Sequence, residues 1–222
     1  MPLDPKLHFP VMCLTQDGLG IPHALQAERL CAAGARWIQL RTKTFLPAEW
    51  HASAVATAEA CRRHGSLFIV NDSVDLALAS GADGVHLGRL DSGWTEARRR
   101  LGPDLILGGT VNDAGDACRA VESGCLDYVG VGPLRFTPTK TPLAPALGFE
   151  GILRLLNTLR GLPAWVIGGV VPLDLPKLRR GGAAGVAVSS SLYRDGRIED
   201  NFRALLEAWT AHAEALWDPL LR

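Results

Sequence analysis

The chain has 222 residues, of which 47% are hydrophobic and 21% are charged, a composition that is ordinary for a folded globular protein. Its 23 acidic side chains balance 23 basic ones, which disfavours a broad surface for nucleic acid or another polyanion. The apolar stretches are too short for a transmembrane helix, and residues 1–6 do not resemble the start of a signal peptide. These features predict a cytoplasmic protein without membrane or nucleic-acid partners.

Short apolar runs alternate with alanine-rich amphipathic stretches along the chain, an order typical of successive βα units. The predicted strands are Phe9–Leu14, Trp37–Leu40, Leu67–Val70, Gly84–Leu87, Leu105–Leu107, Tyr128–Val131, Trp165–Ile167 and Gly185–Val188. The predicted helices are Ile21–Ala33, Ala48–His64, Val74–Ala79, Trp94–Arg100, Ala114–Glu122, Gly151–Leu159, Leu175–Arg179 and Ile198–Trp217. Because the strands are almost entirely apolar, we expect a parallel sheet that is covered on both faces.

The repetition of these units predicts the fold. Eight strand–helix pairs without a linker between them favour a single (β/α)8 TIM barrel over residues 1–222, rather than a doubly wound sheet or two small domains. Several helices are followed by a glycine suited to a left-handed helix end, namely Gly34, Gly65, Gly81, Gly124 and Gly181.

The cysteines and tryptophans carry little functional signal. The five cysteines are odd in number and form no C-x-x-C pair, which favours buried thiols in a reducing compartment over disulfides or metal ligands. The six tryptophans are expected in the core or at an interface. Trp209 and Trp217, on the last predicted helix, are candidate contacts of a homodimer.

Glycine, hydroxyl, amide or charged groups follow seven of the eight predicted strands. In a barrel of this kind the active site lies at the C-terminal ends of the strands, so these groups would share one rim. The segments concerned are Gln39–Lys43, Asn71–Asp72, Gly88–Asp91, Gly108–Thr110, Gly132–Gly148, Gly168–Gly169 and Ser189–Ser190. Their concentration on one face predicts an enzyme rather than a scaffold.

Asp72 and Asp91 are the most specific pair on this rim. Each follows an apolar strand, and the two strands are neighbours in the predicted barrel. Carboxylate oxygens are preferred ligands of a hard cation such as Mg²⁺. Each aspartate could instead cap the helix that follows it. The two carboxylates together favour the metal.

The longest irregular segment, Gly132–Gly148, follows the sixth strand and is long enough to be a binding loop. Its first part, residues 132–140, holds two prolines, two threonines and Lys140, and the hydroxyl and ammonium groups suit phosphate oxygens. With Arg41 and Lys43 it would neutralise a diphosphate beside a divalent ion. The alternative is an ordinary surface loop rich in proline and threonine.

Two glycine-containing segments indicate a second phosphate site. Gly168–Gly169 and Gly185–Ser189 follow or end the last two strands, where many barrels bind phosphate through backbone amides. His86 lies inside an apolar strand pattern and is interpreted as a core residue. No G-x-S-x-G elbow and no Walker A segment occurs.

These motifs, taken together, resemble the thiamine phosphate synthase family over nearly the whole chain. The matching segments are QLRTK at 39–43, VNDSVDLALASGADGVHLGRLD at 70–91, TPTK at 137–140, IGG at 167–169 and VS at 188–189. The resemblance rests on several separate motifs that occur in the order found in the family, with the spacing expected of a barrel. A single match, such as the double glycine, would be a weak signal.

The resemblance implies two substrates. Hydroxymethylpyrimidine diphosphate would contact Gln39, Arg41, Lys43, Asn71, Thr110 and Lys140, with Leu40 and Thr42 completing this part of the substrate-binding set. Mg²⁺ on Asp72 and Asp91 would hold its diphosphate. The thiazole phosphate would contact Thr137, Pro138, Thr139, Gly169, Val188 and Ser189.

The chemistry implied by the resemblance begins with departure of the diphosphate, which leaves a stabilised pyrimidine cation. The thiazole nitrogen then attacks its methylene carbon, so no general base is strictly required. Lys140, Arg41 and Thr110 would be the catalytic groups, supplying positive charge and a hydroxyl near the leaving group. The chain departs from the family at Thr42, where an acidic residue is frequent, and at Thr110, where serine is frequent.

Three other functions are compatible with parts of the pattern. A thiazole tautomerase of the same superfamily would share the barrel but generally lacks the Asn–Asp pair and the TPTK segment. A Schiff-base aldolase would use Lys43 or Lys140 as its nucleophile, and the two aspartates argue against it. A non-catalytic sensor of phosphate ligands would keep the barrel but would not release diphosphate.

Overall fold

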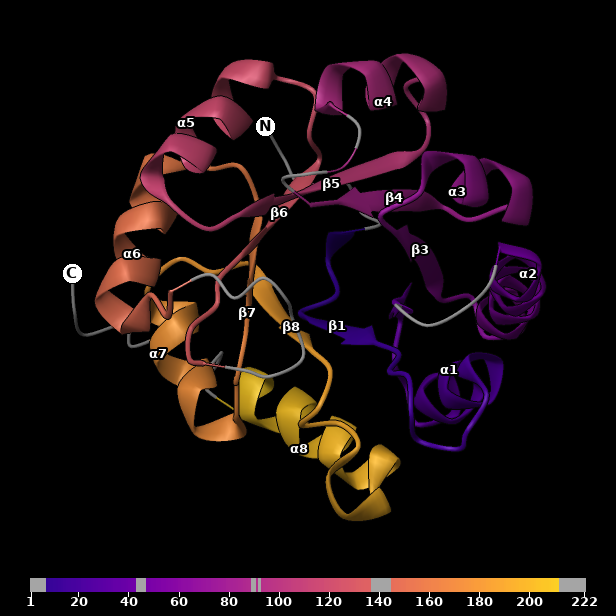
Figure 1. Ribbon diagram of the computed structural model, residues 1–222. Coiled ribbons are helices and arrows are strands. Elements are labelled where there is room, and N and C mark those ends of the chain that lie inside the picture. The colour runs from indigo at the N-terminus through magenta and orange to yellow at the C-terminus, as the bar shows by residue number, and fades with distance from the viewer. Residues whose placement is uncertain (1–6, 43–46, 89–90, 92, 137–144, 212–222) are drawn as a thin grey trace.

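Eight parallel strands close into a barrel that runs in sequence order from β1 (Val11–Leu14) to β8 (Gly185–Val188), with α-helices around it (Figure 1). The structure, a computed structural model, describes residues 7–42, 47–88, 91, 93–136 and 145–211. The first and last strands pair with each other through Cys13 and Val188, which closes the ring. The predicted TIM barrel is confirmed.

The strands and helices alternate strictly. The intervening strands are β2 (Trp37–Leu40), β3 (Leu67–Asn71), β4 (Gly84–Leu87), β5 (Ile106–Val111), β6 (Tyr128–Val131) and β7 (Ala164–Ile167). The helices are α1 (His23–Ala32), α2 (Pro47–Arg63), α3 (Val74–Ser80), α4 (Trp94–Leu101), α5 (Ala114–Ser123), α6 (Gly148–Thr158), α7 (Leu175–Arg180) and α8 (Ile198–Thr210). Short 3-10 turns, η2 (Pro172–Asp174) and η3 (Arg194–Gly196), precede α7 and α8.

The predicted bounds of β2, β4, β6 and β8 are confirmed, whereas β5 is longer than predicted. Gly108–Thr110 belongs to β5 and does not follow it. Two successive glycines weaken the strand signal in a sequence. In the barrel, however, a Cβ on Gly108 would lie 2.2 Å from Cζ of Tyr128, so the strand needs glycine there.

Aromatic rings fill the middle of the barrel. Trp37, Tyr128 and Trp165 are completely buried and pack edge to face, with ring centroids between 4.8 and 5.7 Å apart. Each such pair stabilises a core by about 0.5–1.5 kcal/mol beyond the burial of its area. Because these rings close the barrel interior, a ligand at the C-terminal end of the strands meets them as a floor.

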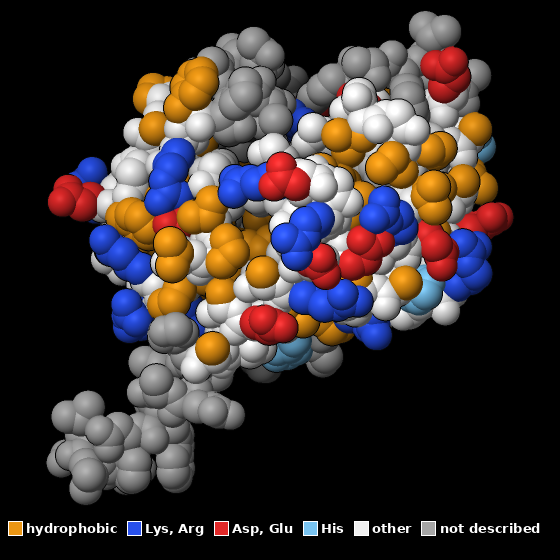
Figure 2. Space-filling view, turned by 90° about the horizontal axis from the view of Figure 1, so that it is seen from below, with side chains coloured by type: hydrophobic (Ala, Val, Ile, Leu, Met, Phe, Trp, Pro, Cys, Tyr) orange, Lys and Arg blue, Asp and Glu red, His pale blue; other side chains and the backbone are white. Residues whose placement is uncertain are grey.

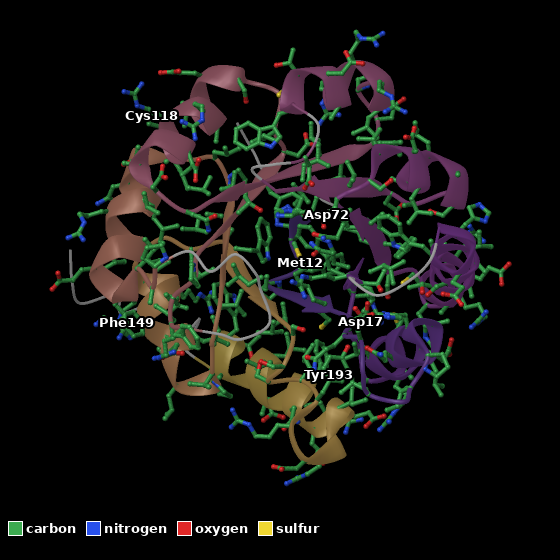
Figure 3. All side chains as sticks on the ribbon, in the orientation of Figure 1. Met12, Asp17, Asp72, Cys118, Phe149 and Tyr193 are labelled. Atoms are coloured by element: carbon green, nitrogen blue, oxygen red, sulfur yellow. The ribbon has the colours of Figure 1, made fainter. Side chains whose placement is uncertain are left out.

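A second apolar layer lies between the barrel and the helices, and three of the cysteines belong to it. Cys13, Cys31 and Cys61 are buried free thiols, as predicted. Cys118 is exposed, which differs from the prediction, because the buried side of α5 is formed by neighbouring residues such as Ala117 and not by Cys118 (Figure 3).

Trp209 also belongs to the core of the subunit. Its side chain is 8% exposed, and the guanidinium of Arg179 lies over its ring, 5.7 Å from the centroid. Arg179 donates a further hydrogen bond to the backbone carbonyl of Trp209. The prediction of Trp209 as a homodimer contact is therefore wrong, because the ring packs within the subunit. Trp217 lies outside the described residues.

Four of the five glycines predicted at left-handed helix ends have that conformation, and at the fifth the left-handed residue lies one position later. Gly34, Gly65, Gly81 and Gly124 have positive φ angles, as predicted. Gly181 has φ −76°, and the left-handed position is Gly182 with φ +91°. Gly181 is glycine for another reason, since a Cβ there would lie 2.2 Å from a methyl of Leu153 on α6.

The charges of the described surface are mixed in sign. On the face shown in Figure 2, Lys and Arg side chains lie among Asp and Glu side chains and form no single basic patch. One such pair, Arg29 with Glu199, joins α1 to α8 at 2.6 Å. Within the described ranges, none of the helices has the length and apolarity needed to cross a bilayer.

Candidate active site

The predicted site residues converge on one cavity at the C-terminal ends of the strands. Eight of them line its wall: Gln39, Arg41, Asn71, Asp72, Thr110, Gly169, Val188 and Ser189. They come from β2, β3, β5, β8 and the segment after β7, so the closed barrel brings together residues that are far apart in the chain. Figure 3 shows Met12, another wall residue, and Asp72 near the barrel axis.

Arg41 follows β2 and is held by the end of β1. Its backbone N–H donates to Oγ1 of Thr15 at 3.2 Å. That hydroxyl lies 2.7 Å from Nδ1 of His23, whose Nε2 lies 3.0 Å from the carboxylate of Asp17. Burial lowers the pKa of Arg41, while the charges of Asp72 and Asp17 raise it. An arginine stays charged in any case, so Arg41 brings a positive charge to the cavity wall.

Asp72 stands at the end of β3 in a conformation that is uncommon for a side-chain-bearing residue. Its φ is +69°, in the left-handed region, and its N–H donates to the carbonyl of His86 at 2.8 Å. The alternative that Asp72 caps the next helix is wrong. Ser73 is the cap, because its side-chain oxygen accepts from the N–H of Leu76 at 3.2 Å. Backbone strain of this kind is concentrated at functional sites.

Asp91 lies beside the cavity but outside its wall. Its Oδ2 accepts the N–H of Gly88 at 2.6 Å, and Gly88 is a wall residue. The N-cap of α4 is Gly93, so Asp91 does not cap that helix. Among the described residues no group of three or more His, Cys, Asp or Glu side chains is placed to hold a metal ion. A metal here would have two protein carboxylates, and that assignment stays a prediction.

A buried polar chain runs below the rim, from Thr110 on β5 to Tyr128 on β6. Nε2 of His86 lies 3.0 Å from Oγ1 of Thr110, and Nδ1 lies 3.1 Å from the hydroxyl of Tyr128. The side chain of Gln39 lies beside the tyrosine hydroxyl. Burial raises the pKa of Tyr128 far above its usual range, so the phenol stays protonated. All four residues line the cavity.

The double glycine after β7 packs against the segment after β6. The N–H of Leu134 donates to the carbonyl of Ile167 at 2.8 Å, and the N–H of Arg135 donates to that of Gly168 at 3.0 Å. Gly168 has φ +97°, and a Cβ there would lie 2.5 Å from Cβ of Pro133. Only glycine fits between these two backbones.

Two side-chain contacts fix this half of the rim further. The guanidinium of Arg135 makes two hydrogen bonds of 2.6 Å to the buried carboxylate of Asp174 and donates to the carbonyl of Gly169 at 2.9 Å. On the next strand end, Ser189 donates to the side-chain oxygen of Gln16 at 3.3 Å. Backbone groups of the segments after β7 and β8 are thereby held in place around the cavity.

The remaining predicted residues lie elsewhere or outside the described ranges. Leu40 is completely buried in the layer between barrel and helices, and Thr42 is 7% exposed; neither lines the cavity. Lys43 and the segment Thr137, Pro138, Thr139 and Lys140 lie outside the described residues. Their predicted roles stay predictions.

Residues 11–192 match the family model described as thiamine monophosphate synthase. The chain belongs to this family. The match spans all eight strands and includes every cavity residue named above. It confirms the resemblance on which the sequence-based interpretation of the site depends.

Curated relatives and a solved structure agree with the thiamine monophosphate synthase family. A thiamine-phosphate synthase of Phocaeicola vulgatus is 40% identical over 172 residues, 76% of this chain and 82% of the relative. A bifunctional thiamine biosynthesis protein of Symbiobacterium thermophilum is 44% identical; the match covers 86% of this chain and 38% of that relative. A thiamine phosphate pyrophosphorylase of Pyrococcus furiosus superposes with TM-score 0.83 at 26% identity, covering 94% of this chain and 98% of that one.

The structure adds wall residues that the sequence did not reveal as site residues. They are chiefly His86, Asn112 and Tyr128, with Met12 and Trp165 at the floor. His86 looked like a core residue because it stands in an apolar strand, yet its inward position at the end of β4 carries it to the cavity. Asn112 directly follows β5 and donates to the carbonyl of Gly132. Correct placement of the end of β5 would have revealed it.

Proposed function

We propose that this chain is a thiamine phosphate synthase, a transferase that joins hydroxymethylpyrimidine diphosphate to a thiazole phosphate and releases diphosphate. The observation that carries the proposal is the convergence, in a chain of this family, of Arg41, Asp72 and Thr110 with the glycine segment after β7 on one cavity. Charged and hydroxyl groups suit a diphosphate donor, and backbone amides suit a second phosphate.

The donor would bind over the ends of β2 to β5. Gln39, Asn71 and Thr110 supply amide and hydroxyl groups for the pyrimidine, and Arg41 supplies a charge for its diphosphate. Leu40 and Thr42 do not line the cavity, so we assign them no direct contact with the donor. Lys43 and Lys140 are the further cations that we assign to the diphosphate.

A divalent metal fits the end of β3 and the segment after β4. Asp72 lines the cavity, and Asp91 accepts the N–H of the wall residue Gly88 at 2.6 Å, which supports these two carboxylates as its protein ligands. Mg²⁺ commonly uses one or two protein carboxylates and completes its shell with phosphate oxygens and water. When bound, it would neutralise charge on the departing diphosphate.

The thiazole phosphate would bind on the opposite side of the cavity. Gly169, Val188 and Ser189 line the wall there, and we assign Thr137, Pro138 and Thr139 to the same phosphate. The hydrogen bonds from Arg135 to Gly169 and from Ser189 to Gln16 hold these groups before a ligand arrives. Pre-formed sites of this kind lose less conformational entropy on binding.

The reaction would require electrostatics and positioning rather than a base. Departure of the diphosphate breaks the bond between methylene carbon and oxygen, and the electron pair leaves with the oxygen. The cationic side chains Arg41 and Lys140 would stabilise that charge, and the thiazole nitrogen would then form the new bond to the methylene carbon. The aromatic floor excludes water from the cation until the nitrogen attacks.

The test is incubation of the purified protein with both substrates and Mg²⁺, with thiamine phosphate identified by mass spectrometry. We expect product with the wild-type protein and none with the double variant Asp72→Ala, Asp91→Ala. A wild-type protein that forms no product, or a double variant that keeps full activity, would overturn the proposal. Borohydride trapping of a carbonyl substrate would instead identify an aldolase.

The proposal also covers the compartment, the domain organisation and the oligomeric state of the enzyme. The three buried free thiols are compatible with a reducing, cytoplasmic compartment, and we assign residues 1–222 to one domain. A homodimer is proposed without Trp209, whose ring is packed inside the subunit. Sedimentation equilibrium would measure the mass in solution, and a monomer would contradict the dimer.

A further inference from the structure

The polar chain is a series of hydrogen-bonded side chains at the cavity floor. Burial determines the direction in which these side chains donate their hydrogen bonds. Its members are Gln39, Tyr128, His86 and Thr110, contributed by four strands of the barrel. The hydroxyl of Tyr128 is completely buried and protonated, so its proton must be donated to an acceptor inside the protein. Among the described residues, Nδ1 of His86 lies in reach, at 3.1 Å.

Gln39 does not offer that acceptor. Its amide is oriented by Nε2, which donates to Sδ of Met12 at 3.4 Å. Turning the amide round would place its oxygen against the sulfur, another acceptor. Tyr128 therefore donates to Nδ1 of His86, its hydrogen-bond partner at 3.1 Å.

The tautomer of His86 follows from this. A neutral imidazole whose Nδ1 accepts carries its proton on Nε2. Nε2 then donates to Oγ1 of Thr110 at 3.0 Å. The opposite direction would aim the Nδ1–H of His86 at the oxygen of Tyr128 and leave the buried proton of Tyr128 without an acceptor among the described residues, which is costly.

The glycines of the neighbouring strands show that the barrel is built around this chain. A Cβ on Gly130 would lie 3.2 Å from Cε1 of His86, and a Cβ on Gly108 would lie 2.2 Å from Cζ of Tyr128. The two rings also pack against each other, with centroids 5.5 Å apart. Both rings are therefore held in one orientation by their surroundings.

We infer that Tyr128 and His86 are positioning residues that turn the hydroxyl of Thr110 into an obligate donor toward the cavity. Since its oxygen accepts from His86, the proton of Thr110 points to whatever the cavity holds. The ligand atom that takes this proton is an acceptor, such as a ring nitrogen or a phosphate oxygen. This inference rests on the proposed function for the identity of the substrate alone.

The direction of the chain can be tested on the unliganded protein by ¹⁵N NMR of labelled histidine. The signals of His86 are identified by their loss in His86→Gln. We expect Nδ1 without a proton and Nε2 with one in the wild type, and loss of this preference in Tyr128→Phe. A protonated Nδ1 in the wild type, or identical signals in Tyr128→Phe, would overturn the inference whatever the enzyme's substrates are.

Tyr193→Phe is the matched control. It removes the chain's other tyrosine hydroxyl, which is also buried and donates to the carbonyl of Leu14 at 3.0 Å. This variant should leave the signals of His86 as they are in the wild type. A change equal to that of Tyr128→Phe would mean that loss of any buried hydroxyl disturbs the barrel, which would contradict a specific role of Tyr128.

Kinetics with the proposed substrates provide the functional readout. Tyr128→Phe should lower kcat about two- to tenfold, the effect of one misdirected hydrogen bond. Thr110→Val should lower kcat at least as much, and adding Tyr128→Phe to it should cost nothing further. Thr110→Ser should keep both activity and sensitivity to Tyr128→Phe. Additive losses would overturn the inference, whereas absence of thiamine phosphate with the expected NMR result would refute the proposed function instead.

Discussion

The two sides of the cavity are lined by different types of residue. Over β2 to β5 the wall consists of functional side chains, above all Arg41, Asp72 and Thr110. Over β7 and β8 it consists of glycines, small apolar residues and serines, with Gly168 and Gly169 both at positive φ. The first side offers charge and hydroxyl groups where bonds would change, and the second offers a shaped surface for a ligand that is held.

This difference leads to distinct expectations for substitutions. Side-chain changes over β2 to β5 should lower kcat, because they remove groups that act on the leaving diphosphate. Backbone changes over β7 and β8 should raise KM for the thiazole phosphate with less effect on kcat.

Asp72→Asn should produce the largest loss, lowering kcat by at least about 100-fold, because the metal would lose one of its two protein carboxylates. The measurement is diphosphate release as a function of Mg²⁺ concentration. Asp75→Asn is the control, since Asp75 is an exposed residue of α3 whose ion pair with Arg100 lies at the surface. Equal activity of the two variants would contradict the metal assignment.

Gly168→Ala should raise KM for the thiazole phosphate about tenfold and also destabilise the fold, because its Cβ would collide with Pro133. Gly161→Ala separates the two effects. Gly161 has φ +88° but nothing within 4 Å of a Cβ, so it adds strain without a collision. We expect both variants to have a lower Tm and only Gly168→Ala to have a higher KM. A raised KM in both would mean that stability, and not the shape of the wall, is being measured.

Arg135→Lys should raise KM for the thiazole phosphate about two- to fivefold and leave KM for the pyrimidine diphosphate unchanged, because lysine cannot reproduce the two-point contact with Asp174. Steady-state kinetics with each substrate varied in turn would measure both constants. Arg154→Lys, in the exposed pair with Glu150, is the control. An equal change of both KM values would contradict the division of the cavity.

Thr15→Val should have the smallest effect, about two- to threefold on kcat, because the backbone of Arg41 loses one hydrogen bond. Thr15→Ser keeps the hydroxyl and should restore activity. The comparison is made at saturating concentrations of both substrates. If serine fails to restore activity, packing of the methyl group rather than the hydrogen bond holds Arg41.

The barrel and much of the wall over β2 to β5 could be predicted from the sequence. Apolar runs such as Trp37–Leu40 and Tyr128–Val131 are strong strand signals, and their bounds are confirmed. Arg41 and Asp72 follow such strands, so their position at the C-terminal end of the barrel could be inferred from chain order alone. Charged and hydroxyl groups can also be recognised in the sequence from the residue type alone.

Other features depend on contacts between distant segments. The strand character of Gly108 becomes evident only beside the ring of Tyr128, and the role of His86 depends on Thr110, which belongs to the next strand. The pair Arg135–Asp174 joins residues 39 positions apart through a fold that no local pattern describes. Likewise, whether Asp72 or Ser73 caps α3 is decided by backbone angles, not by residue type.

The stoichiometry of one reaction tests most directly whether the cavity joins a donor to an acceptor. The wild-type protein is mixed with the pyrimidine diphosphate and Mg²⁺, with and without the thiazole phosphate, and diphosphate and thiamine phosphate are quantified together. We predict equal amounts of the two products when both substrates are present. Diphosphate without thiamine phosphate, or neither product, would contradict a cavity that joins a donor to an acceptor.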